Sequence, residues 1–487
     1  MDFEVMQLSQ LERFESGIRE LDALLKGGFV SGASYLIQGR PGSGKTILAN
    51  QIAFNHINRG GGAVFATLLS ESHDRMFSFL STLSFFDKAR VGSDIQYLSA
   101  FDTLEKEGLE AVIKLLRREI IRNKATLLIV DGLLNARSKA ETPLDTKKFI
   151  AELQAHASSA GCTLLFLTSS MLDEGSPELT MVDGMIALAE QGLGIRSIRR
   201  ISVRKSRGSA AMEGEHEYQI TDQGFVVYPR LEVLFNTPSG SLKNSTEKIP
   251  SGVVGLDEAL RGGLCRSSIS LILGPSGCGK TTLGLNFILQ STAEEPGLFL
   301  GFYETPEQLA LKADAFELGL RSLIEQDIVR MHWQPTTELQ LDNVGHNLIE
   351  AVREHKVKRV VIDSLGAMAR PAVAQNRLVE FFSALMNELR ALDVTVYATW
   401  EVGTLLGPDI NAPAPELCSI ADNLFIVRFE EKKQEIKSFF SILKVRNSPF
   451  DRSQQAVEIG KGGMSLVTSQ KKVKGKKEIS CSPISIT

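Results

Sequence analysis

Two stretches with one pattern decide the fold: Gly39-Arg-Pro-Gly-Ser-Gly-Lys45-Thr46 in the first half of the chain and Gly274-Pro-Ser-Gly-Cys-Gly-Lys280-Thr281 in the second. Both satisfy G-x-x-x-x-G-K-[ST], a phosphate-binding loop whose glycines let backbone N–H groups curl around the phosphates. The Lys then reaches the β- and γ-phosphates, and the Thr hydroxyl binds Mg²⁺. Because the two loops lie about half a chain length apart, the sequence predicts a duplicated nucleoside triphosphatase with a complete site in each half.

The loops and the residues beside them are therefore predicted to bind ATP. The predicted nucleotide-binding residues are Gly39, Gly42, Ser43, Gly44, Lys45, Thr46 and Ile47, then Gly274, Ser276, Gly277, Cys278, Gly279, Lys280, Thr281 and Thr282. The two lysines are also predicted to be catalytic, because a cation at this position neutralises charge on the transferring phosphate.

Each loop stands between a predicted strand and a predicted helix. Apolar runs at 34–37 and 270–273 end at the loops, and the apolar positions of 47–57 and 282–289 have helical spacing. Further apolar runs recur at matching offsets, at 63–69 and 297–302, 126–130 and 359–362, and 163–168 and 394–399. Near-continuous apolar strands separated by helical segments predict an α/β fold, with a mainly parallel sheet covered by helices on both faces in each half.

The domain boundary is predicted at 236–245, a stretch rich in Ser, Asn, Gly and Pro. We expect a first ATPase domain at 1–235, a linker at 236–248 and a second ATPase domain at 249–467. The remainder, 468–487, contains the basic run 471–477 and is predicted to be a disordered tail.

Bulk properties exclude several classes of protein. The 487 residues carry a formal net charge of −4, which gives no general attraction to nucleic acid or acidic membranes. Five scattered cysteines without a C-x-x-C pair predict neither a disulfide framework nor a zinc site, and fit a reducing cytoplasm. The first residues lack the apolar segment of a secretory signal, and no apolar run is long enough to span a membrane. We therefore expect a cytoplasmic protein.

Two pairs of acidic residues complete the predicted chemistry. Asp131 and Asp363 each end an apolar strand, separated by nearly the same interval as the loop lysines, and are predicted to hold Mg²⁺ together with Thr46 and Thr281. The catalytic candidates for activating water are Glu71 and Glu304, each after the second strand of its half.

A pair of cations recurs late in each half, as Lys205-Ser-Arg207-Gly-Ser209 and Lys444-Val-Arg446-Asn-Ser448. On a strand, Lys-x-Arg would place both cations on one face, because side chains alternate. Such a pair can stabilise a γ-phosphate from a neighbouring subunit, as arginine fingers do. A solvated charged face is the alternative interpretation.

These motifs resemble the KaiC family, circadian-clock ATPases of the RecA-like superfamily, from about residue 14 to residue 467. The second half is similar in 303–306, 362–365 and 444–446, and the first half in 217–224. The resemblance implies two RecA-like domains in a double-ring hexamer, with ATP and Mg²⁺ at subunit interfaces. It also implies that Thr221 and Asp222 bind nucleotide. The residues it places in trans are Lys205, Arg207, Ser209, Lys444, Arg446 and Ser448.

The family's pattern is not complete. Clock proteins have tandem Glu where this chain has Ser70-Glu71 and Tyr303-Glu304. Where they phosphorylate an adjacent Ser-Thr pair, this chain has Cys418-Ser419, so Ser419 is the phosphoacceptor candidate. The resemblance implies a KaiC-like ATPase with a serine/threonine autokinase activity, which assembles with itself and with a regulatory protein, KaiB-like in kind.

Two other functions remain open from sequence. A RecA-like DNA-processing ATPase of recombination or repair would share the same core. The mild acidity and the lack of a basic loop with aromatic residues speak against it. A scaffold that binds ATP without turnover is the third possibility, and the intact Lys, Thr, Asp and Glu set in both halves speaks against that function.

Overall fold

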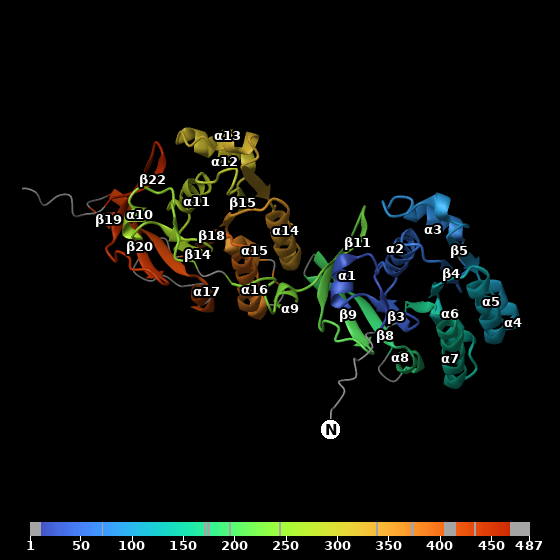
Figure 1. Cartoon of the computed structure of the whole chain (residues 1–487). Helices are drawn as coiled ribbons and strands as arrows, with labels where there is room; N and C mark the ends of the chain where they lie inside the picture. Colours follow the sequence, from blue (N-terminus) through green and yellow to red (C-terminus); the bar gives the residue numbers. More distant parts are fainter. Residues whose placement is uncertain are drawn as a thin grey trace, which may run out of the picture. The chain divides into compact units, whose positions relative to one another are not determined.

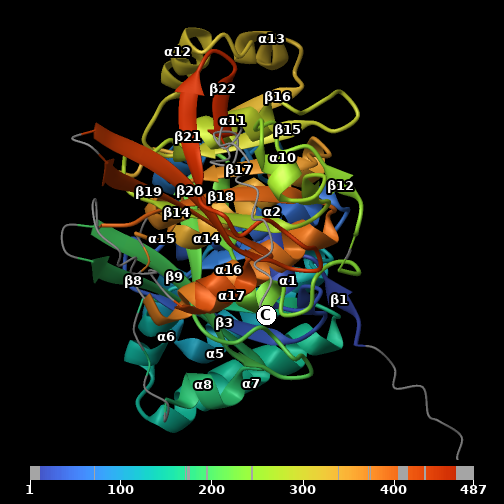
Figure 2. The same ribbon diagram turned by 90° about the vertical axis from the view of Figure 1, so that its left-hand side faces the viewer.

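A computed structural model of the chain describes residues 11–70, 72–169, 172, 176–193, 196–242, 245–337, 339–370, 372, 375–403, 415–432 and 435–467. The chain divides into two compact units, one ending at Leu234 and the other beginning at Phe235. Figures 1 and 2 show the same elements from two directions. The predicted tail at 468–487 lies outside the described residues.

The first unit follows the predicted order of strands and helices. Its elements are β1 (Arg13–Phe14), α1 (Arg19–Leu24), β2 (Phe29–Val30), β3 (Ser34–Gly39), α2 (Lys45–Asn58), β4 (Ala63–Thr67), α3 (His73–Leu80), η1 (Lys88–Arg90), β5 (Ile95–Ser99), α4 (Phe101–Glu107), α5 (Leu109–Arg122), β6 (Leu127–Asp131), α6 (Leu133–Lys139), α7 (Pro143–Ser159), β7 (Thr163–Thr168), α8 (Pro177–Met181), β8 (Gly184–Leu193), β9 (Arg196–Ser206), β10 (His216–Thr221), β11 (Gly224–Tyr228) and α9 (Leu231–Leu234).

The second unit repeats the order. Its elements are β12 (Lys248–Ile249), α10 (Leu256–Ala259), β13 (Leu264–Cys265), β14 (Ile269–Gly274), α11 (Lys280–Ile288), β15 (Gly297–Gly301), α12 (Pro306–Ala315), α13 (Leu320–Glu325), β16 (Val329–Trp333), α14 (Leu341–Glu354), β17 (Arg359–Asp363), α15 (Leu365–Ala369), η2 (Gln375–Arg377), α16 (Leu378–Ala391), β18 (Thr395–Glu401), α17 (Pro415–Ile420), β19 (Asn423–Lys432), β20 (Glu435–Val445), β21 (Gln455–Gly460) and β22 (Gly463–Val467).

The two main sheets have one topology. The strand order is β11-β10-β9-β8-β3-β7-β6-β4-β5 in the first unit and β16-β15-β17-β18-β14-β19-β20-β21-β22 in the second. Six strands from β8 to β5, and six from β16 to β19, run parallel, and the remaining three add antiparallel at one side. The prediction of two tandem RecA-like α/β domains with mainly parallel sheets is therefore confirmed.

Helices cover both faces of each sheet because consecutive residues of the central strands point to opposite faces and are apolar on both faces. In the first unit, Ile37 and Phe65 pack with α1 and α2, whereas Leu36 and Val64 pack with α4 to α7. Figure 1 shows these helix groups on opposite sides of the sheet. Burial on both faces explains why β3 is buried along its whole length.

The predicted loops connect strand to helix in both units. β3 leads through the first loop into α2, and β14 leads through the second into α11. Parallel strands bring their carboxyl ends to one edge of a sheet, where ligands bind in open α/β folds. Asp131 ends β6 and Asp363 ends β17 at this same edge. None of the helices described is both long and apolar enough to cross a lipid bilayer.

Candidate ATP-binding sites

The two phosphate-binding loops have a backbone that requires glycine. Gly42 and Gly44 have φ of 83° and 87°, and Gly277 and Gly279 have φ of 79° and 102°, in the region that side chains disfavour. A Cβ on Gly44 would also lie 2.6 Å from Cδ1 of Ile220. Neither α2 nor α11 has a side-chain cap at its first turn, so their leading N–H groups face the loop. That arrangement favours an anion.

The loop lysines hold their charge inside the loops. Lys45 Nζ donates to the carbonyls of Gly39 and Arg40 at 2.7 and 3.0 Å. Lys280 Nζ donates likewise to Gly274 and Pro275 at 2.9 and 2.6 Å. Burial lowers the pKa of Lys45, and the charge of Asp131 opposes this shift. A bound phosphate would favour the charged ammonium, so this side chain is suited to an anionic ligand.

The predicted Mg²⁺ ligands lie together in both units. Thr46 Oγ1 is 3.3 Å from Asp131 Oδ2, and Thr281 Oγ1 is 2.7 Å from Asp363 Oδ2. Hydroxyl and carboxylate oxygens suit Mg²⁺, which keeps several waters and takes its other ligands from phosphates. No cluster of three His, Cys, Asp or Glu side chains that could hold a metal ion occurs within the described residues. One hydroxyl and one carboxylate in each unit fit an ion that takes its other ligands from nucleotide phosphates and water.

In the second unit, a hydroxyl on the neighbouring strand contacts the predicted Mg²⁺ ligand. Thr399 Oγ1 on β18 donates to Asp363 Oδ1 at 2.5 Å, so both carboxylate oxygens accept hydrogen bonds. In the first unit, Leu167 of β7 lies beside Asp131 on the neighbouring strand. Two hydroxyl groups thus orient the predicted Mg²⁺ ligand of the second unit.

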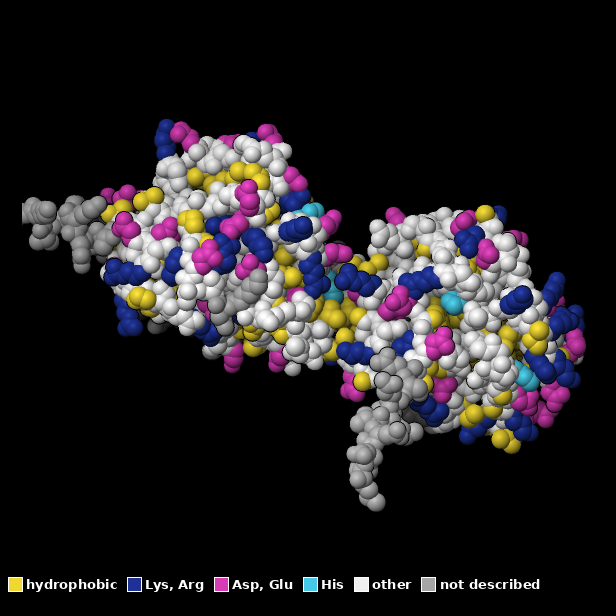
Figure 3. All heavy atoms as spheres, in the orientation of Figure 1, with side chains coloured by type: hydrophobic (Ala, Val, Ile, Leu, Met, Phe, Trp, Pro, Cys, Tyr) yellow, Lys and Arg dark blue, Asp and Glu magenta, His cyan; other side chains and the backbone are white. Residues whose placement is uncertain are grey.

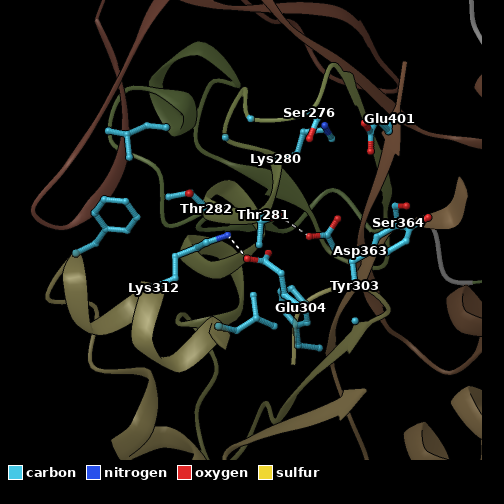
Figure 4. A pocket seen from close by; sticks show the side chains of 17 residues that line it. Ser276, Lys280, Thr281, Thr282, Tyr303, Glu304, Lys312, Asp363, Ser364 and Glu401 are labelled. Atoms are coloured by element: carbon cyan, nitrogen blue, oxygen red, sulfur yellow. Dashed lines mark hydrogen bonds and ion pairs between the residues drawn. The ribbon is translucent and has the colours of Figure 1, made fainter. Parts of the chain in front are cut away.

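A cavity of about 650 Å³ opens over the second loop (Figure 4). Loop residues, Asp363, Glu304, Lys312 and Glu401 line it. Glu304 lies three residues after the end of β15 and forms an ion pair with Lys312, with Oε1 and Nζ 2.5 Å apart. Glu71, its predicted counterpart, lies outside the described residues. A carboxylate thus faces the phosphate loop in the second unit, as a water-activating group must.

A β-hairpin packs on each loop. In the first unit, Tyr218 on β10 donates its hydroxyl to the carbonyl of Ser43 at 2.7 Å, and its ring stacks on Phe225 at 4.4 Å. Thr221 and Asp222 form the turn of this hairpin, where the Thr221 hydroxyl accepts from Gln223 N at 3.2 Å. Their binding to nucleotide stays a prediction. In the second unit, Ile459 and Met464 of β21 and β22 take the corresponding place, against Gly279.

The lysines of the late cation pairs contact their own subunit. Lys205 Nζ donates to the carbonyls of Leu179 and Val182 at 2.9 and 2.5 Å. Lys444 Nζ donates in the same way to Cys418 and Ala421, at 3.1 and 2.7 Å. Burial lowers the pKa of each lysine, followed by the charge of the nearby arginine. Each lysine therefore tethers the short helix, α8 or α17, that precedes the next strand.

The arginines lie just beyond the strands, in a turn, so the prediction that both cations lie on one strand holds for the lysines only. The side chains of Arg207 and Arg446 are 59% and 46% exposed, and these residues are more exposed than the two lysines. Each pairs at 3.4 Å with the aspartate immediately before the preceding strand, Asp183 before β8 or Asp422 before β19. The exposed guanidinium groups are thus the better candidates for contact with a second subunit.

The serines of these segments also have partners within their own unit. Ser209 Oγ donates to the carbonyl of Leu25 at 2.9 Å, and Ser448 Oγ accepts from Lys248 Nζ at 2.8 Å. Ser419 is exposed on α17, and Arg446 donates to its carbonyl at 2.5 Å. The proposed acceptor and the proposed trans-acting arginine are therefore directly connected.

Sequence reasoning missed four residues around these sites. The sequence contained a pattern that could have identified Asp183 and Asp422, because each lies 24 positions before its arginine in both halves. Lys312 and Thr399 had no such pattern, since neither belongs to a motif. On the face drawn in Figure 3, cationic and anionic side chains of the described residues are interspersed, without a continuous basic stripe of the kind that binds nucleic acid.

Comparison with known proteins agrees with this geometry. A family model described as the KaiC ATPase matches residues 14–232 and again 249–471. The circadian clock oscillator protein KaiC of Picosynechococcus sp. is 24% identical over 481 residues, which cover 94% of this chain and 90% of that protein. The protein of the same name from Synechococcus elongatus is 23% identical over 494 residues, covering 98% and 93%. Circadian clock oscillator protein KaiC 1 of Synechocystis sp. is 22% identical, covering 93% and 88%.

Proposed function

Because this chain belongs to the KaiC family of ATPases, we propose that it is an oligomeric, Mg²⁺-dependent ATPase whose active sites are each completed by a neighbouring subunit. Lys45 and Lys280 bind the β- and γ-phosphates, and the Thr and Asp pairs hold the ion. Bound Mg²⁺ neutralises charge that develops on the phosphates. Glu71 and Glu304 orient the attacking water and take its proton.

One observation carries the composite site: the late cations lie at the opposite edge of the sheet from their own loop. Ser206 pairs with Gly184, and Gly184 pairs with Tyr35, near the start of β3. The loop follows Gly39, four residues further along. At about 3.3 Å per residue, about 13 Å of strand separates the two places. Arg207 therefore serves a nucleotide on another subunit, and the register of β14, β19 and β20 gives Arg446 the same position.

Mixing two inactive variants tests this arrangement. Lys280→Ala removes a phosphate ligand from the second site, and Arg446→Ala removes the donated cation. Each alone should lose second-site turnover. If the variants are mixed without ATP and then assembled with it, one interface in about four joins an intact loop to an intact arginine. Recovery of about a quarter of the lost rate supports the composite site, and recovery of none contradicts it.

Assembly itself is the second consequence of the proposal. A composite site needs a closed set of neighbours, so ATP and Mg²⁺ should promote a ring, a hexamer in the family's manner. Light scattering of the protein at micromolar concentration with saturating ATP checks this. A monomer under these conditions would contradict the proposal.

The same chemistry has two outcomes, hydrolysis and autophosphorylation, which differ in the group that accepts the phosphoryl group. We propose that Glu304 activates water or, in an assembled ring, takes the proton of Ser419 on the adjacent subunit. Ser419 is exposed and lies beside Arg446. Because the relatives are named circadian clock oscillator proteins, we propose that a regulatory protein, KaiB-like in kind, binds according to the nucleotide state. Phosphopeptide mapping and ATPase assay on one ATP-loaded sample separate hydrolysis from autophosphorylation.

A further inference from the structure

The ion pair in the cavity of the second unit joins the proposed water-activating residue to a lysine that belongs to no motif. Glu304 directly precedes Thr305, the N-cap of α12, and a capping box between Thr305 and Gln308 fixes this turn. Lys312 lies two turns further along the same helix, and its Nζ is 2.5 Å from Glu304 Oε1. Figure 4 shows both side chains pointing into the cavity, below Thr281. The pair is therefore local to one helix and needs no second subunit.

This pairing limits what the carboxylate can do. A general base must have a free oxygen within hydrogen-bond reach of the water whose proton it takes. The ammonium of Lys312 occupies one oxygen of Glu304, and both side chains are about two thirds buried, at 32% and 35% exposure. Partial burial weakens the screening of the pair by water. The resting carboxylate, which faces the phosphate loop, thus has one of its two oxygens engaged by Lys312.

The two halves of the chain differ at this position. Lys312 lies eight positions after Glu304, and the eighth position after Glu71 is Phe79. A phenyl ring cannot form an ion pair with a carboxylate. The lysine that pairs with Glu304 therefore has no counterpart at the matching position of the first half.

We propose that Lys312 is a positioning residue that holds Glu304 in a resting arrangement and thereby restrains ATP hydrolysis in the second domain. The proposal rests on the role given to Glu304 under Proposed function. In the hydrolytic step, the water oxygen bonds to the γ-phosphorus, and the bond from phosphorus to the bridging oxygen breaks. ADP leaves with that electron pair, and the water proton passes to Glu304. Until Lys312 releases the carboxylate, Glu304 can offer the water only its second oxygen.

The experiment measures second-site turnover, taken as the part of the ATPase rate that Lys280→Ala loses. Lys312→Met should raise its kcat about three- to fivefold, the size expected for loss of one partly exposed ion pair, with KM unchanged. Lys312→Arg retains the pair and should behave like the wild type. The fraction of bound nucleotide present as ATP, measured after rapid gel filtration, should fall in Lys312→Met only.

A double variant tests whether Lys312 acts through Glu304. Glu304→Gln should abolish second-site turnover, and adding Lys312→Met to it should change nothing further. Lys461→Met is the matched control, since Lys461 pairs with Glu317 at 2.7 Å outside the cavity lining. It should leave kcat unchanged.

Three results overturn the inference: an unchanged or lower kcat in Lys312→Met, a raised KM, or an effect that persists beside Glu304→Gln. A raised KM would mean that Lys312 binds the nucleotide instead. Failure of the proposed function looks different, because Glu304→Gln would then leave second-site turnover intact.

Discussion

Replacing Thr399 by Val tests how the second site orients Asp363, its proposed Mg²⁺ ligand. The change keeps the shape of a fully buried side chain and removes only the hydroxyl that donates to Asp363 at 2.5 Å. Asp363 keeps its hydrogen bond from Thr281 at 2.7 Å. We expect the carboxylate to remain in place but to lose its fixed rotation.

The structure sets the size of the effect. A hydrogen bond to a charged group contributes about 1.5–3 kcal/mol, and the partial exposure of Asp363 lets water replace part of it. A loss of about 1.4 kcal/mol corresponds to a tenfold weaker affinity for the ion, the lower end of what partners of metal ligands contribute. The Mg²⁺ concentration for half-maximal second-site turnover should therefore rise about tenfold.

Thr395→Val is the matched control. Thr395 lies at the other end of β18, where its buried hydroxyl accepts a hydrogen bond from Ser267 N at 2.9 Å. Both variants should lower the urea midpoint of the second unit, which contains both tryptophans and is therefore followed by their fluorescence. Only Thr399→Val should move the Mg²⁺ titration. Equal titration curves for Thr399→Val and the wild type would refute the role assigned to the Thr399 hydroxyl in orienting Asp363.

Three further predictions concern assembly, modification and pH. If the first ring holds the oligomer together, Lys45→Ala should disperse it more than Lys280→Ala in light scattering, and equal dispersal would contradict this. Prolonged incubation with ATP should add one phosphate per chain by intact-mass spectrometry, absent in Ser419→Ala; two phosphates would contradict a single acceptor. Burial, followed by the charge of Arg230, lowers the pKa of His216 to about 4, so the unfolded chain binds the proton more readily. The first unit should therefore lose about 2 kcal/mol of stability between pH 7 and pH 5, and less in His216→Asn, by urea titration with circular dichroism.

Much of the fold follows from the sequence because its signals are local. The loops require glycine at fixed positions, and the strands beside them are apolar on both faces, so β7 occurs at the predicted 163–168. Asp131 and Asp363 were predictable because a strand ending at the loop edge places its last side chain there.

The remaining features depend on contacts between distant segments. Thr399 reaches Asp363 only because β17 and β18 are neighbours in the sheet, which a single strand does not reveal. Arg446 lies in a turn and not on β20, because that strand ends at Val445, where it pairs with Asn423. Lys312 is one charged residue on a half-exposed helix, and only the direction of Glu304 distinguishes it from its neighbours.

In each unit the phosphate loop lies at one edge of the sheet and the late arginine at the other. This arrangement determines how many complete sites an assembly of subunits contains. If the proposed composite site is correct, every subunit receives an arginine from one neighbour and gives one to another. An open arc of n subunits would then have n − 1 complete sites of each kind, and its last loop would lack a donor. Closing the arc completes that site without adding a subunit. The rate per chain should then depend on whether the ring is shut, and a single broken ring would be distinguishable from an intact one by turnover alone.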